Sequence, residues 1–222
     1  MCKGATMFDA HAVTLSPFET MVLNVSLLMV IGWSMWRAER TLSPGSDLLI
    51  LALMGVFAVS GRVLLDPLPN IQPVTVIVLL AGIQFGSSRA VLLATSVALL
   101  SNVFLGHGIW TLYQAAGWSL VGISGSVLSD KMHVLGILSP SRVAALSVVA
   151  AFCFDWIVSL SALHSFGAEL FPVYIISGIP FDMLHASGNV VFAAWLSTPL
   201  SEMMSRHSRS RTVVMRTVAT PT

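Results

Sequence analysis

The sequence contains few charged residues and almost no lysine. Of its 222 residues only 9% are Asp, Glu, Lys or Arg, and the only lysines are Lys3 and Lys131. A soluble globular domain carries about 25% charged residues, because polar groups must cover its outside. Since 55% of this chain is hydrophobic, an ordinary water-soluble fold is excluded. The surface of the protein is expected to contact lipid.

Other absences exclude further classes of protein. The two cysteines, Cys2 and Cys153, provide no disulfide framework. A formal net charge of +1 gives no reason to expect a nucleic-acid partner. No glycine-rich phosphate loop ending in Lys-Ser or Lys-Thr occurs, so the chain is not expected to hydrolyse ATP alone. Uphill transport of a solute would therefore need an ion gradient or a separate motor.

Seven apolar segments have the length and composition expected of transmembrane helices. Clusters of Gly, Pro, Ser and Asn separate them. The predicted fold class is therefore all-α, a polytopic transmembrane helical bundle. The segments run approximately from 18 to 36, 47 to 65, 73 to 86, 89 to 105, 111 to 129, 142 to 163 and 172 to 199.

The basic residues predict the orientation of the chain in the cell membrane. Alternating the loops puts nine of the eleven Lys and Arg residues on one side and leaves Lys3 and Arg62 on the other. Short cytoplasmic connections concentrate Lys and Arg, so the C-terminal tail is predicted to be cytoplasmic and residues 66–72 external. Polar residues also gather on this external side, which indicates one polar mouth.

Three ionisable residues fall inside predicted spans: Asp155, Asp182 and His185. Such groups are costly in a membrane and usually face a cavity or a partner. Asp182, His185 and Asn189 are spaced i, i+3 and i+7, so they share one face of the last helix. That face either contacts a ligand or forms a hydrogen-bond network between helices. Asp155 is a single acid that is also expected to pair with a neighbouring helix.

Small residues recur every three positions in the second span, at Ala52, Gly55, Ala58 and Gly61. Such a strip allows close approach of another helix, either within the bundle or from a partner protein. The glycines of the fifth span are expected to serve internal packing. They are Gly117, Gly122 and Gly125.

Four stretches in order resemble the substrate-binding membrane subunits (S components) of energy-coupling factor (ECF) transporters. They are residues 61–64 (GRVL), 69–75 (PNIQPVT), 101–114 (SNVFLGHGIWTLYQ) and 180–189 (PFDMLHASGN). The family turn usually reads Gly-x-Gly-Pro-Trp-Thr-x-Trp-Gln, whereas this chain has Ile109 and Tyr113 in place of the proline and the second tryptophan.

The resemblance implies a six-helix S-component core over residues 47–200. It leaves an N-terminal segment at 1–17, one extra N-terminal transmembrane helix at 18–40 and a basic cytoplasmic tail at 201–222. It implies a vitamin-like substrate, held near the outer face under two loops. Relatives with the Trp-Thr turn are often associated with cobalamin-like or unassigned micronutrients. A transmembrane coupling protein and two cytoplasmic ATPase subunits would drive the bound subunit to topple in the lipid bilayer. No catalytic residue, cofactor or metal is implied, so the chain is not expected to be an enzyme.

Carried over residue by residue, the resemblance assigns a binding site and an interface. Ala52, Gly55 and Ala58 would meet the coupling protein. The substrate-binding residues would be Arg62, Asn70, Gln72, Asn102, Trp110, Gln114, Asp182, His185 and Asn189.

Two other functions remain open on the residues alone. An ion-coupled secondary transporter or channel would need a polar path from mouth to mouth, to which the intramembrane acids could contribute. An intramembrane aspartyl hydrolase could use Asp155 and Asp182 as a carboxyl pair, although neither has a Gly-x-Gly-Asp surround.

Overall fold

The computed structural model describes residues 46–218 and, ahead of them, residues 16–19, 21, 22, 25, 26, 29 and 33. The predicted extra helix at 18–40 and the segment at 1–17 therefore lie largely outside the described residues.

The described part of the chain is almost entirely helical, which confirms the all-α prediction. The six predicted spans from residue 47 onward each correspond to a helix. The helices are α2 (Ser46–Leu64), α3 (Val74–Phe85), α4 (Ser87–Leu105), α5 (Trp110–Val127), α6 (Ser129–Met132), α7 (Pro140–Ser159) and α8 (Leu163–Val218).

Glycine and proline set three of the helix boundaries. Gly86 separates α3 from α4 with φ of 85°, and Gly106 ends α4 with φ of 105°. These left-handed conformations are adopted readily only by glycine. Pro140 is the first residue of α7, where its missing N–H has no helical partner to lose.

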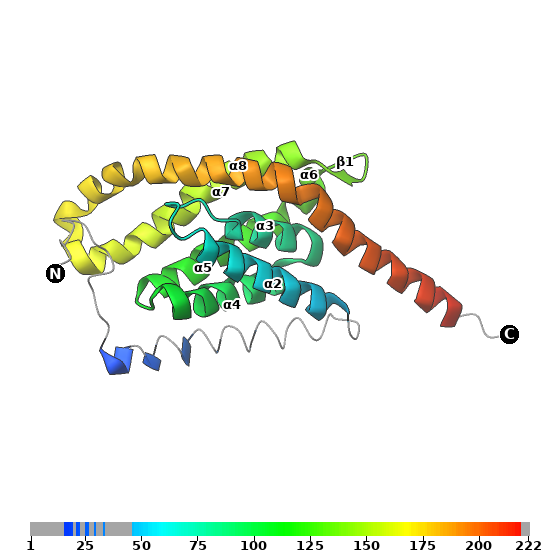
Figure 1. Cartoon of the computed structure of the whole chain (residues 1–222), viewed down its shortest axis with the longest axis horizontal. Coiled ribbons are helices and arrows are strands. Elements are labelled where there is room, and N and C mark those ends of the chain that lie inside the picture. The colour runs from blue at the N-terminus through cyan, green and yellow to red at the C-terminus, as the bar shows by residue number, and fades with distance from the viewer. Residues whose placement is uncertain are drawn as a thin grey trace.

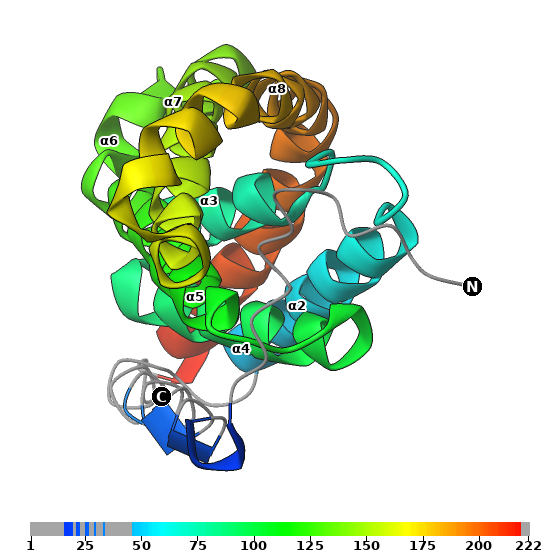
Figure 2. The same ribbon diagram turned by 90° about the vertical axis from the view of Figure 1, so that its left-hand side faces the viewer.

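Helix α3 lies at the centre of the bundle. It packs against α2, α4, α5, α7 and α8, and Figure 2 shows it surrounded by them. Every residue from Val74 to Ile83 is buried. A helix with no exposed face shows no amphipathic period, and it can be shorter than its neighbours.

Glycines allow α3 and α5 to approach closely. A Cβ atom on Gly82 would lie 2.0 Å from the carbonyl oxygen of Gly122, and one on Gly125 would lie 2.5 Å from the carbonyl oxygen of Leu79. A Cβ on Gly117 would lie 2.8 Å from the Phe154 ring. The predicted internal packing of the glycines in this span is confirmed.

Helices α7 and α8 form a long pair, joined by a 3-10 turn at Leu160–Ala162 and a kink at Gly167. Figure 1 shows α8 running the length of the bundle and projecting beyond it at the C-terminal end. The helix continues beyond the predicted span end at residue 199, through Pro199 to Val218. The predicted boundary between core and tail at 200/201 thus falls inside α8.

A small β-hairpin interrupts the helices between α6 and α7, where no strand was predicted. Strand β1 (His133–Val134) pairs antiparallel with β2 (Ile137–Leu138), and Leu135 between them has φ of 51°. Leu135 is 98% exposed. Strands of two residues are too short to produce a recognisable alternation in the sequence.

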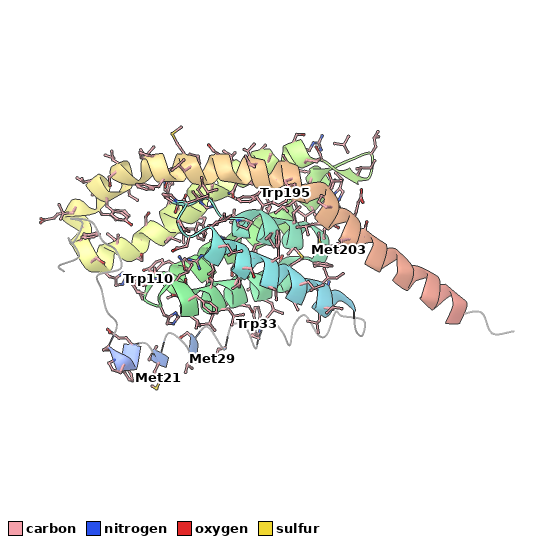
Figure 3. The ribbon with its side chains drawn as sticks, in the orientation of Figure 1. Met21, Met29, Trp33, Trp110, Trp195 and Met203 are labelled. Carbon is pink, nitrogen blue, oxygen red and sulfur yellow. The ribbon has the colours of Figure 1, made fainter. Side chains whose placement is uncertain are left out.

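The outer surface of the bundle is strongly apolar. Two helical stretches within the described residues are long and apolar enough to cross a membrane, α4 and Pro140–Ser205, and α2 and α3 are shorter apolar helices. Large apolar side chains are exposed on several helices, including Val56, Val103 and Trp195, the last labelled in Figure 3. A six-helix transmembrane bundle stays a prediction.

The bundle has two distinct ends. Figure 1 shows the β-hairpin and the projecting part of α8 at one end, and the turn from α7 into α8 at the other. We call the first the hairpin end and the second, where a cavity lies, the cavity end.

Candidate functional site

Arg62, in the last turn of α2, is buried at the cavity end. Its Nε donates a hydrogen bond to Oε1 of Gln72 (3.2 Å), and its Nη1 donates to the hydroxyl of Ser101 and to Oδ1 of Asn102 (2.8 Å). Only 6% of this arginine is exposed. The guanidinium therefore ties the loop after α2 to the end of α4.

Asn102 extends this network from α4 to α5. Its Nδ2 donates to Oγ1 of Thr111 (2.7 Å) and to Oε1 of Gln114 (2.8 Å), while its Oδ1 accepts from Arg62. Both amide hydrogens are thus used within the protein. Asn102 acts mainly by holding Arg62 and Gln114 in place.

The conformation of the turn between α4 and α5 accounts for its Gly-x-Gly-x-Trp-Thr sequence. Gly106 needs a positive φ, and a Cβ on Gly108 would lie 2.2 Å from the Trp110 ring. Thr111 accepts a bond from the backbone N–H of Gly108 (3.4 Å) and lies 3.1 Å from Nδ1 of His107. Partial burial of the imidazole lowers the pKa of His107.

Asn70 has a left-handed backbone in the loop between α2 and α3, with φ of 57°. Asparagine is one of the few residues other than glycine that tolerates this conformation. Its side chain borders the cavity described below, so the residue serves both the loop and the lining.

On the opposite wall, α7 and α8 bring two buried acids together with His185. Oδ2 of Asp155 lies 2.9 Å from Nδ1 of His185, and Oδ2 of Asp182 accepts a bond from Nε1 of Trp156 (3.2 Å). Asp155 and Asp182 are 8% and 6% exposed. Each acid therefore has its own partner, and no hydrogen bond joins the two carboxyls within the described part of the chain.

A chain of polar contacts positions the His185 ring. Nε1 of Trp118 can only donate, so Oγ1 of Thr75 accepts from it (3.2 Å). Oγ1 of Thr75 also lies 2.9 Å from Nε2 of His185. Nδ1 of His185 meets Oδ2 of Asp155 on the other side of the ring. These two contacts fix the orientation of the imidazole between α3 and α7.

An aromatic row connects the two walls. The Arg62 guanidinium carbon lies 5.0 Å from the centroid of Trp118, Phe154 stacks on Trp118 at 4.6 Å, and His185 meets the Phe154 ring edge-on at 5.6 Å. The row places the cation at one end and the His185–Asp155 pair at the other.

These groups surround a cavity of about 670 Å³. Asp66, Ser177 and Phe181 are exposed members of its lining, so the cavity reaches the surface between the loop after α2 and α8. The lining combines polar groups with aromatic rings. It comprises Arg62, Asp66, Asn70, Gln72, Asn102, Leu105, Trp110, Gln114, Trp118, Phe154, Asp155, Val158, Ser159, Ser161, Tyr174, Ser177, Gly178, Phe181 and Asp182.

Comparison with known proteins identifies a family. A model of a family of unknown function, DUF6580, matches residues 43–210. The chain belongs to this family. No curated protein and no solved structure matches the chain. The DUF6580 match includes every residue that lines the cavity.

The structure of this DUF6580 chain brings together seven of the nine residues predicted from sequence to bind substrate. Two do not line the cavity. His185 lies behind Asp155, and Asn189 is fully buried with its Nδ2 donating to the carbonyl of Ser147 (3.2 Å). The seven in the lining are Arg62, Asn70, Gln72, Asn102, Trp110, Gln114 and Asp182.

Several lining residues were missed or weighted too low from the sequence. Asp155 was expected mainly to pair with a neighbouring helix, whereas it both pairs with His185 and lines the cavity. Trp118 and Tyr174 were not predicted. In the sequence, a tryptophan in the middle of an apolar span looks the same whether it lines a cavity or packs in the core. Only the fold distinguishes these two positions.

The predicted coupling strip does not form one external face. Ala52 is exposed, Gly55 is partly buried with Leu93 of α4 at 3.4 Å from its ideal Cβ, and Ala58 is 0% exposed. A spacing of three residues rotates round a helix of 3.6 residues per turn, which carries Ala58 into the core. Ala58 therefore cannot contact a partner protein, and the prediction is wrong for that residue.

Proposed function

We propose that this chain is a membrane-embedded subunit that captures a small polar molecule and passes it to an energy-driven import module. It resembles the S components of ECF transporters in the stretches that build the cavity. In this proposal the cavity faces outward, the C-terminus is cytoplasmic, and a coupling protein with two ATPases supplies the energy.

The observation that carries the proposal is the blind cavity. Its lining comes from the cavity end of α2, α4, α5, α7 and α8. The hairpin end is filled by buried apolar side chains such as Met54, Leu80 and Val143. A channel needs a polar path through the whole bundle, so a cavity that stops at an apolar core favours capture over conduction.

The apolar exterior supports a position in the membrane. Exposed side chains that are large and apolar occur along α4, α7 and α8, for example Phe104, Val149 and Val191. A monomeric soluble protein rarely exposes contiguous apolar patches of more than a few hundred Å². Lipid would remove the cost of exposing these groups.

The cavity favours a ligand of moderate size with a ring. A volume of about 670 Å³ lies within the range of roughly 300–1,000 Å³ that holds drug-sized molecules. Aromatic side chains line it beside the amides and charges, among them Trp110, Tyr174 and Phe181. This fits a small micronutrient better than a corrinoid as large as cobalamin.

The aspartyl hydrolase reading is weaker on this geometry. Two catalytic carboxyls that share a proton lie within hydrogen-bond distance of each other. Here Asp155 bonds to His185 and Asp182 to Trp156. Each acid is engaged with a different partner, which favours a binding role.

Native mass spectrometry and uptake together test the proposal. The chain is purified in detergent from cells grown in rich medium, and any retained small molecule is identified by mass. Its uptake is then measured in cells that carry this chain with or without a functional ATPase module. We expect a bound small molecule whose uptake requires both. Uptake that persists without ATPases but stops with a protonophore would instead establish an ion-coupled transporter.

A further inference from the structure

Arg62 is a buried cation with no carboxylate in contact among the described residues. Within the described residues no carboxylate oxygen lies within 4.0 Å of its nitrogens, and its acceptors are the neutral groups of Gln72, Ser101 and Asn102. Asp66, one turn further along the chain, is exposed, lies beyond that distance and attracts the guanidinium only through space. Buried charges are normally paired, because losing water is costly.

One edge of this guanidinium is available to the cavity. Nε and Nη1 make all three hydrogen bonds, which use their three hydrogens. Nη2 makes no hydrogen bond to the described residues. It is accessible and not enclosed by protein. Since Arg62 is 94% buried and lines the cavity, its two Nη2 hydrogens point to a ligand position.

The opposite wall repeats this arrangement with the opposite charge. Asp155 and Asp182 each use only Oδ2 in a hydrogen bond. Neither Oδ1 atom has a partner among the described residues, and neither is enclosed. Both acids line the cavity, so two acceptor oxygens face the same space as Nη2 of Arg62.

We infer that the cavity binds a dipolar ring compound, with an anionic group on Arg62, a cationic group on Asp155 and Asp182, and the ring in the space between these two walls. The inference rests on the proposed function of this cavity and names its substrate class. A ligand with both charges would compensate the buried cation and the buried acids together. A ligand with one charge would leave the other wall uncompensated, with the penalty of an unpaired buried charge.

A matched set of benzene derivatives tests the charge requirement. The probes are 4-(aminomethyl)benzoate, which carries both charges, benzylamine, which carries only the cation, and 4-methylbenzoate, which carries only the anion. Binding to the purified full chain is measured by quenching of tryptophan fluorescence and by thermal stabilisation. We expect the dipolar probe to bind at least about tenfold more tightly than either of the others.

Variants on each wall assign the two charges. In Arg62→Gln the preference for the dipolar probe over benzylamine should disappear, and in Asp182→Asn its preference over 4-methylbenzoate should disappear. Arg62→Lys keeps the charge and should keep the first preference, so it covers the case in which Arg62→Gln fails to fold. Arg142→Gln and Asp130→Asn are matched controls at the hairpin end, where both residues are exposed.

The outcomes separate this inference from the proposed function. Equal binding of all three probes, no binding of the dipolar probe, or unchanged preferences in both wall variants would overturn the inference. If the retained cellular molecule is imported by an ATPase module but carries a single charge, the proposed function stands and the inference fails. If a dipolar molecule binds but is not imported, the inference stands and the proposed function fails.

Discussion

The cavity end and the hairpin end of the bundle fill the space between their helices differently. At the hairpin end, glycines bring α3 and α5 into backbone contact, as at Gly82 and Gly122. At the cavity end, the ring of Trp118 from α5 stacks on the ring of Phe154 from α7 and keeps the helices further apart. Helix α5 contributes to both ends, with Gly122 and Gly125 towards one and Trp110 and Gln114 towards the other.

The difference shows how one bundle can be tightly packed at one end and hold a cavity at the other. Small residues fix the distance between α3 and α5 at one end, and larger polar and aromatic residues line the space at the other. The cavity then depends on the packed end for its shape. Substitutions in the packed end should affect stability, and substitutions in the cavity end should mainly affect binding.

Gly82→Ala should have the largest effect, because the new methyl group would meet the Gly122 carbonyl at 2.0 Å. Overpacking typically costs about 1–3 kcal/mol, and the rigid backbone carbonyl puts this case at the upper end or above it. We expect almost no folded protein, measured by size-exclusion chromatography in detergent. The matched control is Gly178→Ala at the cavity end, where the nearest side-chain atom would be 3.9 Å away. Loss of folding in both variants would contradict the contrast between the ends.

Ala58→Trp should also prevent folding, because Ala58 is 0% exposed. Ala52→Trp places the same side chain on the exposed face of α2 and should leave thermal stability unchanged. If that face meets a coupling protein, Ala52→Trp should abolish uptake while ligand binding persists. Normal uptake by folded Ala52→Trp protein would remove this face of α2 from the interface.

Asn102→Ala should weaken ligand binding by roughly 1 to 3 kcal/mol, because Arg62, Thr111 and Gln114 all lose a bond to it. Calorimetry with the retained cellular ligand measures the effect. Asn102→Asp restores the acceptor for Arg62 but not the two donors, and it should recover only part of the affinity. Full affinity in Asn102→Ala would show that Arg62 does not need this support.

His185→Ala should weaken binding by a similar or smaller amount, roughly 1 to 3 kcal/mol, although His185 does not line the cavity. Its loss leaves Asp155 without the donor that orients it. His185→Gln, which can still donate, should recover part of the affinity. Calorimetry decides this, and an effect on folding with no effect on the affinity of folded protein would make His185 purely structural.

The smallest expected effect is the pH dependence conferred by His107. Burial lowers its pKa in the folded chain, so the unfolded chain binds the proton more readily. The stabilising contribution is therefore complete above the unfolded pKa of about 6.5 and is lost as the pH falls below it. Thermal unfolding between pH 5 and pH 8 should show a shallower decline at low pH in His107→Gln. Identical pH profiles would contradict the assignment.

Most helix boundaries could be predicted from the sequence because their signals are local. Gly86, Gly106 and Pro140 end or begin helices where the breaks were predicted. The β-hairpin at 133–138 and the continuation of α8 through Pro199 could not be predicted. Two-residue strands are too short to leave a pattern in the sequence. A proline ends a helix only where neighbouring structure does not hold the helix together across it.

The candidate site could be predicted in part, because its polar residues are unusual in apolar surroundings. Arg62, Asn102, Gln114 and Asp182 stand out for that reason, and the fold places them round one cavity. The depth of each residue could not be predicted. Asn189 shares a helical face with Asp182, yet it lies two turns deeper, where α8 packs on the carbonyl of Ser147.

The sequence by itself determined an all-α fold, the position of most helices and the polar residues that gather at one end. Only the tertiary structure decided how each helix is rotated, which put Ala58 in the core, His185 behind Asp155 and the free edge of Arg62 towards the cavity. The physical reason is that the outer surface of these helices is as apolar as their core. Periodicity then cannot distinguish inside from outside, and only the packing of neighbouring helices makes that distinction.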